Sequence, residues 1–329
     1  MSDKMQDDQR HQSEPSHWER DLLNQMVMAT VAENRKSRRW GIFFKLLTFA
    51  YLFILLAMFL WSDKLEVDQT KATEHTALIN VKGLISSETK ASADKVVTAL
   101  RDAYEDEKTK GIILRMNTPG GSPVQSRYIN REIGRLKEKH PDIPVYAVVS
   151  DICASGGYYI AAAADKIYAD EGSLVGSIGV LINGFGFVDG MQQLGIERRL
   201  LTAGENKGML DPFSPLDQSD KRHVQQMLDQ LHNQFIETVK EGRGDRLKVD
   251  QHPEIFSGLF WSGEEARQLG LIDEFGSSSY VAREVIGAEE IVDFTKKEEV
   301  WDRLARNLGA GAASVFASMA GLGEGLTIR

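Results

Sequence analysis

Cysteine is almost absent from this chain, since Cys153 is the only one among 329 residues. An intrachain disulfide is therefore excluded, and the position of Cys153 at the end of an apolar run favours packing over a nucleophilic role. Acidic residues outnumber basic ones by 48 to 39, and the resulting net charge of −9 disfavours a nucleic-acid partner. The chain shows no internal repeat, and we predict no cofactor and no metal site.

Long apolar runs are also rare: the chain has one, at residues 40–61, directly after a basic cluster at residues 35–39. Only Lys45 interrupts it, close enough to the basic end for its amine to reach back to the membrane surface. About 20 apolar residues cross a bilayer, and Trp40 and Trp61 stand where interfacial aromatic residues are common. A buried core helix is the alternative. A cleaved signal peptide is disfavoured, because the preceding segment is too long and no A-x-A pattern follows.

We therefore predict a single-pass transmembrane helix at residues 40–62, with residues 1–39 in the cytoplasm. In a bacterial cell this orientation places the chain in the inner membrane, with its larger part in the periplasm. Three further segments complete the predicted organisation: a linker at 63–76, a globular domain at 77–294 and a C-terminal tail at 295–329.

Strand and helix patterns alternate through the globular domain. Short apolar runs predict strands at residues 77–81, 111–116, 145–149, 166–169, 179–182, 197–201 and 290–294. Apolar residues at helical spacing predict helices at residues 92–106, 122–139, 160–164, 217–240, 263–269 and 280–286. Ser122, Pro123 and Gln125 fit the N-cap, N1 and N3 positions of the second helix. The alternation predicts an α/β fold with a mostly parallel sheet covered by helices.

The stretch from Asp151 to Tyr159 is the best candidate for a catalytic site. It joins an apolar strand to a helix through small residues, a turn that exposes the hydroxyl of Ser155. Gly156 and Gly157 would place their N–H groups at the positive end of that helix, where a developing oxyanion is stabilised. A plain strand-to-helix turn has the same pattern, so this stretch alone does not decide between the two.

A serine nucleophile needs a base, and no histidine is placed beside Ser155 by a recognisable motif. His75 opens the first predicted strand and is the hardest to dismiss. The others precede the apolar run or lie in polar surroundings: His11, His17, His140, His223, His232 and His252. A lysine can replace histidine where burial or a neighbouring cation lowers its pKa. Lys207 lies in a glycine-flanked loop, although most lysines in such loops are simply solvated.

Four segments, in the same order, resemble the signal peptide peptidase A (SppA) family in its short, single-repeat form. They are residues 117–121, the turn at Ser155, residues 172–180 and the loop of Lys207. The resemblance covers roughly residues 77–287. It implies the α/β fold shared by Clp protease and crotonases, with a repeated β-β-α core. It also implies a membrane-anchored serine endopeptidase that uses a Ser–Lys dyad.

By this resemblance Ser155 is the nucleophile, Lys207 is the general base, and Ser177 orients Lys207. Without the resemblance, Ser177 is an ordinary turn serine. The implied oxyanion hole combines the backbone N–H of Gly156 with that of Gly120 or Gly121, which the sequence does not distinguish. The family also implies a homo-oligomeric ring whose neighbouring subunits share active sites, so Ser155 and Lys207 of one chain would lie far apart.

The implied substrates are signal peptides and other apolar peptides, left in the inner membrane after preproteins are cleaved. Two other functions stay open. A crotonase-like acyl-CoA enzyme would have the same fold but needs neither a Ser–Lys pair nor a membrane anchor. A catalytically silent membrane scaffold would need the anchor alone.

Overall fold

The computed structural model describes residues 38–57 and 73–296, together with Met26 and Met28. Most of the predicted cytoplasmic segment, most of the linker, Trp61 and nearly all of the C-terminal tail lie outside the described residues. The chain divides into two units, Met1–Asp68 and Gln69–Arg329, which are described separately below.

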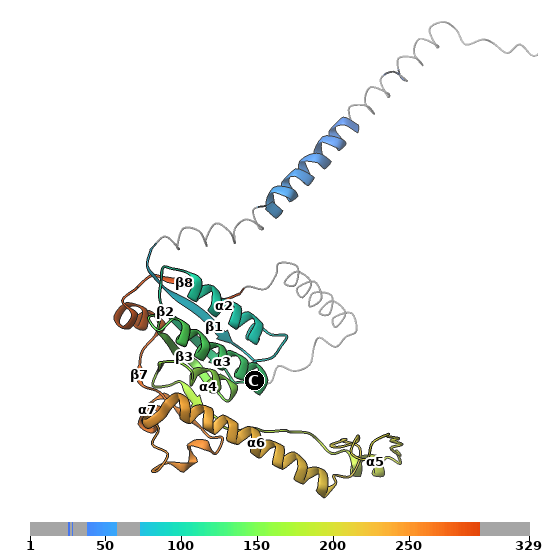
Figure 1. The fold of residues 1–329 in the computed structure, drawn as a ribbon. Coiled ribbons are helices and arrows are strands. Elements are labelled where there is room, and N and C mark those ends of the chain that lie inside the picture. Colours follow the sequence, from blue (N-terminus) through green and yellow to red (C-terminus); the bar gives the residue numbers. More distant parts are fainter. Residues whose placement is uncertain (1–25, 27, 29–37, 58–72, 297–329) are drawn as a thin grey trace, which may run out of the picture. The chain divides into compact units, whose positions relative to one another are not determined.

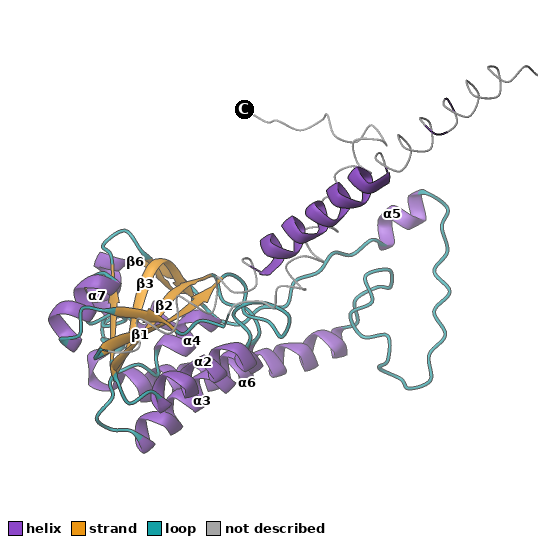
Figure 2. Ribbon diagram, turned by 90° about the horizontal axis from the view of Figure 1, so that it is seen from above, coloured by secondary structure: helices purple, strands orange, loops and turns teal. Residues whose placement is uncertain are grey.

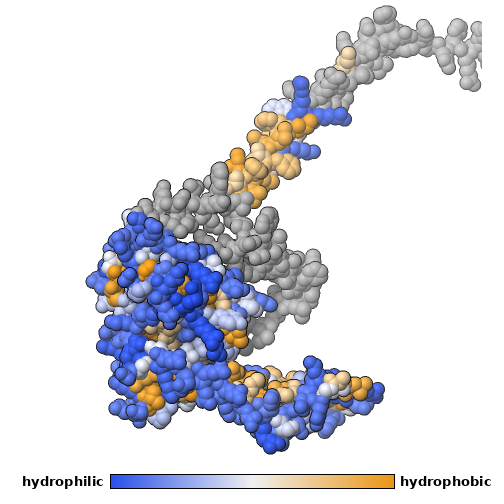
Figure 3. Space-filling model, viewed as in Figure 1, coloured by the Kyte–Doolittle hydropathy of each residue, from blue (hydrophilic) through white to orange (hydrophobic). Residues whose placement is uncertain are grey.

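The first unit contains a helix at Arg38–Ala57, close to the predicted apolar segment. It is 20 residues long, and its side chains are exposed almost throughout. Figure 3 shows its apolar surface. Among the described residues this is the one helix long and apolar enough to cross a membrane.

The second unit is built around one sheet of eight strands with helices packed on it (Figure 1 and Figure 2). Along the main path the strands are β6 (Phe260–Ser262), β5 (Leu174–Gly176), β3 (Val145–Ala154), β2 (Thr109–Thr118), β1 (His75–Lys82) and β8 (Ile291–Asp293). Two more strands extend it from β3, namely β4 (Lys166–Ala169) and β7 (Glu274–Phe275). All the pairings are parallel except that of β5 with β6. The structure confirms the predicted α/β fold class.

The central strands β1, β2 and β3 read as continuous apolar runs because both faces of a parallel sheet are covered. Ile79, Leu114 and Ala147 are fully buried in the main core, while Ile113 belongs to a smaller cluster. The sequence shows these strands clearly, but β5, β6 and β7 are two or three residues long and too short for a periodic pattern.

The helices of the second unit are α2 (Ala93–Glu105), α3 (Pro123–Lys139), α4 (Gly156–Ala161), α5 (Val188–Gln193), α6 (Gln218–Arg243), α7 (Gly263–Leu269) and α8 (Ser278–Tyr280). Three further helical segments are the 3₁₀ turns η1 (Gly244–Arg246) and η2 (Pro253–Phe256) and the π-helical η3 (Val281–Ile286). The predicted cap of α3 is confirmed, since the Ser122 side chain accepts a hydrogen bond from the backbone N–H of Gln125. The helix predicted at residues 160–164 begins earlier, at Gly156, directly after Ser155.

The predicted strands at residues 179–182 and 197–201 are wrong. Residues 180–217, which we call the arm, run from the sheet to the far end of α6 and carry α5 (Figure 1 and Figure 2). A strand needs a partner for its backbone, and the arm leaves the sheet before it can find one. Its apolar side chains are exposed instead, among them Leu181, Phe185, Leu194 and Leu201.

The carboxylate of Glu132 on α3 links this helix to α2, and its contribution to the stability of the fold can be measured. Its carboxylate accepts hydrogen bonds from Arg135 of α3 and from Arg101 of α2, each at 2.7 Å. The bond from Arg135, opposed by burial and aided by Arg101, lowers the pKa of Glu132 from 4.5 to about 2. A carboxyl with a lowered folded-state pKa stabilises the fold above its unfolded pKa, and this contribution is lost as the pH falls towards 2.

We expect Glu132→Gln to lower the free energy of unfolding by about 1 kcal/mol at pH 7, because the bridge is partly exposed. The difference from the wild type should shrink as the pH falls from 4.5 towards 2. Urea unfolding of the full chain in detergent measures both, with Glu138→Gln, an exposed site on the same helix, as the control. An equal loss at pH 7 and pH 2.5 would show that the charge of Glu132 is irrelevant.

Candidate functional site

Ser155 stands alone between the end of β3 and the first residue of α4. Its backbone has φ 51° and ψ −123°, a left-handed conformation that is strained for a residue other than glycine. The backbone N–H of Ser155 donates to the carbonyl of Gly176 on β5 at 2.8 Å, which fixes the turn to the sheet. No hydrogen bond holds the Ser155 hydroxyl within the described part of the chain, so it is free to react.

The turn opens into a cavity of about 670 Å³. Its polar lining includes Ser155, Ser177, Gly121 and Gly156, so the structure brings these four predicted residues together. The remaining wall is largely apolar and comes mainly from α3, α4, α6 and the start of the arm. Its apolar members include Val124, Tyr159, Leu181, Leu231 and Phe235.

The backbone hydrogen bonds separate Gly120 from Gly121. The Gly120 N–H donates to the hydroxyl of Thr118 at 3.0 Å, whereas that of Gly121 has no acceptor among the described residues. The Gly156 N–H is the first of α4, where a helix offers no acceptor of its own. A Cβ placed on Gly156 would lie 3.3 Å from the Gly121 nitrogen, so the two peptide groups are neighbours. Gly121 and Gly156 thus have neighbouring backbone N–H groups without an acceptor among the described residues.

The backbone of Ser177 is also strained. Its φ is 52°, and its N–H donates to the carbonyl of Leu259 at 2.7 Å. Its hydroxyl lies free of hydrogen bonds to any described residue. Three residues other than glycine have a positive φ in the described part of the chain: Ser155, Ser177 and Leu210. Two of them line the cavity, and the third lies in the loop of Lys207, as expected where strain serves a functional geometry.

Lys207 lies in the arm and not in the lining of the Ser155 cavity. It belongs to a series of tight turns in which its N–H donates to the carbonyl of Gly204 at 3.1 Å. The side chain is exposed, and within the described residues its amine forms no hydrogen bond and no ion pair. A single chain therefore presents the Ser155 hydroxyl and the Lys207 amine in different places.

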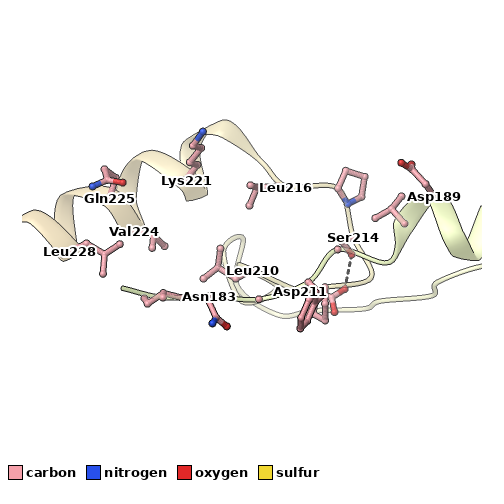
Figure 4. A pocket seen from close by; sticks show the side chains of 17 residues that line it. Asn183, Asp189, Leu210, Asp211, Ser214, Leu216, Lys221, Val224, Gln225 and Leu228 are labelled. Atoms are coloured by element: carbon pink, nitrogen blue, oxygen red, sulfur yellow. Dashed lines mark hydrogen bonds between the residues drawn. The ribbon is translucent and has the colours of Figure 1, made fainter. Parts of the chain in front are cut away.

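A second cavity, of about 600 Å³, lies between the arm and the beginning of α6 (Figure 4). Leu210, Leu216 and Val224 line it. Beside them Asp211 accepts a hydrogen bond from the Ser214 hydroxyl at 2.7 Å, which, with a weaker contribution from Arg198, lowers the pKa of Asp211. These contacts tie the end of the Lys207 loop to the rest of the arm.

None of the histidines that the structure describes lines the cavity at Ser155. His75 is fully buried, with its Nδ1 atom 2.9 Å from the carbonyl of Thr73, and it does not line the cavity. His232, which the sequence places in polar surroundings, is half-buried on α6, with its Nε2 atom 3.1 Å from the carbonyl of Ile178. Cys153 is buried, and burial raises the pKa of its thiol, which confirms its packing role.

Sequence reasoning missed Arg127 and Gln234, which lie on facing helices at the cavity wall. Each stands one turn from an apolar wall residue, Val124 on α3 and Leu231 on α6. Helical spacing alone shows which side chains share a face. It does not show that these two faces meet beside Ser155.

Comparison with known proteins places this chain in a family. The model of peptidase family S49 matches residues 137–291. A putative protease of Methanocaldococcus jannaschii is 31% identical over 237 residues, which are 72% of this chain and 73% of that protein. A putative signal peptide peptidase SppA of Enterococcus faecium is 32% identical over 203 residues, 62% of this chain and 55% of the relative.

A Brucella abortus protein named Na(+)/H(+) antiporter NhaA is 40% identical over 230 residues, 69% of this chain. This chain spans only 31% of that protein, so its name describes a much longer molecule. The fold, the S49 match and the coverage of the archaeal relative define the class: this chain belongs to peptidase family S49.

Proposed function

We propose that the chain is a serine endopeptidase in which Ser155 attacks the peptide carbonyl. One observation supports this proposal above the others: an unbonded hydroxyl on a strained turn lines the same cavity as two glycines whose backbone N–H groups have no acceptor among the described residues. Such donors stabilise the negative oxygen of a tetrahedral intermediate, and each contributes about 3–4 kcal/mol in comparable sites. Gly121 and Gly156 supply them.

Lys207 is the proposed base, and Ser177 its positioning residue. A neutral Lys207 amine takes the proton of the Ser155 hydroxyl as the oxygen bonds to the carbonyl carbon, and then passes that proton to the leaving amine. The acyl-enzyme that remains is hydrolysed by water, with Lys207 again accepting a proton. The Ser177 hydroxyl, free in the cavity, orients the amine by hydrogen bonding.

The proposed active site is shared between copies of this chain in a homo-oligomer. Lys207 lies on an arm that leaves its own sheet and does not line the Ser155 cavity, which supports delivery of the amine by a neighbouring subunit. The arm also exposes apolar side chains, visible in Figure 3, with Leu201 at 96% and Phe185 at 80% exposure. Apolar surface of this kind favours burial against a partner.

The proposed substrates are apolar peptides, including signal peptides left in the membrane. The largely apolar cavity wall suits such segments. The helix at Arg38–Ala57 would anchor the chain in the bacterial inner membrane, with the catalytic domain in the periplasm, and so confine enzyme and substrate to one plane.

A serine-directed fluorophosphonate probe tests the nucleophile. We expect the full chain in detergent to be labelled and Ser155→Ala to remain unlabelled, because phosphonylation needs the activated hydroxyl. Ser257→Ala, a cavity serine outside the proposed machinery, is the control and should label normally. Labelling that persists in Ser155→Ala, or fails in the assembled wild type, would favour an acyl-CoA enzyme or a silent scaffold.

A further inference from the structure

The cavity at Ser155 has one charged residue in its wall. Among the described residues that line it, Arg127 alone carries a charge. Arg127 stands on α3 one turn after Pro123 and Val124, which line the same cavity. Its position is therefore set by a rigid helix next to the proposed nucleophile.

Arg127 has no anionic partner in the described part of the chain. Its Nη1 atom donates to the amide oxygen of Gln234 on α6 at 2.9 Å, and Gln234 is neutral. Two other arginines nearby are satisfied differently, because Arg101 and Arg135 both bind the carboxylate of Glu132 at 2.7 Å. The guanidinium of Arg127 thus keeps hydrogen-bond donors and its full charge for another group.

The surroundings of Arg127 leave it open to an anion. The residue is half-buried, and the cavity wall around it includes Val124, Leu231 and Phe235. Its hydrogen bond with Gln234 is exposed, so an anion that enters the cavity can reach the guanidinium. The planar guanidinium matches a carboxylate in particular, since it can donate two parallel hydrogen bonds to it.

We propose that Arg127 binds a carboxylate of the peptide substrate and so sets which bond Ser155 attacks, an inference that rests on the proposed peptidase function. A cavity of about 670 Å³ holds both residues, so the carboxylate belongs to a residue near the scissile bond. Its source is either the free C-terminus of an apolar peptide or an acidic side chain within it. The preferred substrate is therefore apolar with one nearby negative charge.

Binding without turnover tests the proposal. We would use the full chain in detergent with Ser155→Ala, and one fluorescent apolar peptide in three forms: a free C-terminal acid, a C-terminal amide, and that amide with one internal glutamate. Fluorescence anisotropy should show one or both charged peptides binding about tenfold more tightly than the neutral amide. A preference for the acid identifies the C-terminus as the source, and a preference for the glutamate peptide identifies the side chain.

Substitutions then assign the preference to Arg127. In the same background, Arg127→Gln should reduce the ratio of affinities to about one, while Arg127→Lys should keep part of it by retaining the charge. Arg131→Gln is the matched control, since Arg131 is exposed on the same helix and does not line this cavity. With Ser155 intact, the ratio of kcat/KM for charged over neutral peptide should follow the same order.

Two results would overturn carboxylate recognition: charged peptides that bind no better than the neutral amide, or a preference that survives Arg127→Gln. Failure of the peptidase function looks different. A wild-type chain that cleaves none of the three peptides, while its Ser155→Ala form still shows Arg127-dependent binding, would refute the proposed activity and leave carboxylate recognition standing.

Discussion

Co-expressed Ser155→Ala and Lys207→Ala subunits should regain about one quarter of wild-type peptide cleavage, although either variant alone loses activity by about 10⁴-fold or more. The recovery follows from the position of Lys207 on an arm that leaves its own Ser155 cavity. In a random ring, one site in about four combines the intact Ser155 of one subunit with the intact Lys207 of its neighbour. Peptide hydrolysis by the purified mixture measures the effect.

The matched control replaces one partner with the double variant, in which both residues are alanine. Mixtures that contain it should stay inactive, because no arrangement of subunits then supplies both groups. Two affinity tags, one on each variant, verify that the subunits assemble together. A co-purified mixture of the two single variants that remains inactive would mean that both residues act within one chain.

Gly121→Ala should lower kcat by about 10²–10³-fold, the cost of one misplaced oxyanion donor. The φ of Gly121 is 147°, which alanine rarely adopts, and a Cβ there would collide with the carbonyl oxygen of Ile85. The loop must shift to relieve this contact, and the N–H then moves away from the Gly156 N–H. Single-turnover cleavage of an apolar peptide measures the loss at the chemical step.

Gly134→Ala is the control for Gly121→Ala. Gly134 lies within α3, and a Cβ there meets no atom within 4 Å, so activity should be unchanged and the helix stabilised by about 1 kcal/mol. An unaltered oligomer in gel filtration shows that Gly121→Ala still folds. Turnover by an intact Gly121→Ala oligomer within a few fold of the wild type would remove Gly121 from the oxyanion hole.

The strands and helices whose apolar residues are buried within the chain could be predicted from the sequence. The centre of β2, with Ile112, Ile113 and Leu114 fully buried, forms an apolar run that only a covered strand needs. The stripe of α6 likewise includes Phe235 and Val239, which are buried in the main core. The arm has similar apolar runs without a sheet beside them. Its sequence pattern alone does not say what those residues pack against, which is why two strands were predicted wrongly.

The candidate site was predictable where one short stretch sets the geometry. The small residues around Ser155 predict a sharp turn without information from the rest of the chain. The choice between Gly120 and Gly121 depends instead on the hydroxyl of Thr118, which occupies one N–H. The role proposed for Arg127 depends on the cavity that α3 and α6 form beside Ser155, and its hydrogen-bond partner Gln234 comes more than 100 residues later in the chain. Contacts of that range leave no local pattern to recognise.

Helix α6 contacts the segment that follows Ser155 and also adjoins the arm that carries Lys207. Near its C-terminal end, the hydroxyls of Thr238 and Tyr159 are hydrogen-bonded at 2.9 Å, and Gly242 packs directly on Ala162, so this end of α6 is held against the segment that follows Ser155. Its opposite end begins where the arm ends. At 26 residues it is about 39 Å long and connects these two regions as one continuous helix. If a neighbouring subunit shifted the arm, α6 would be the direct covalent and packing route from that contact to the segment that follows Ser155.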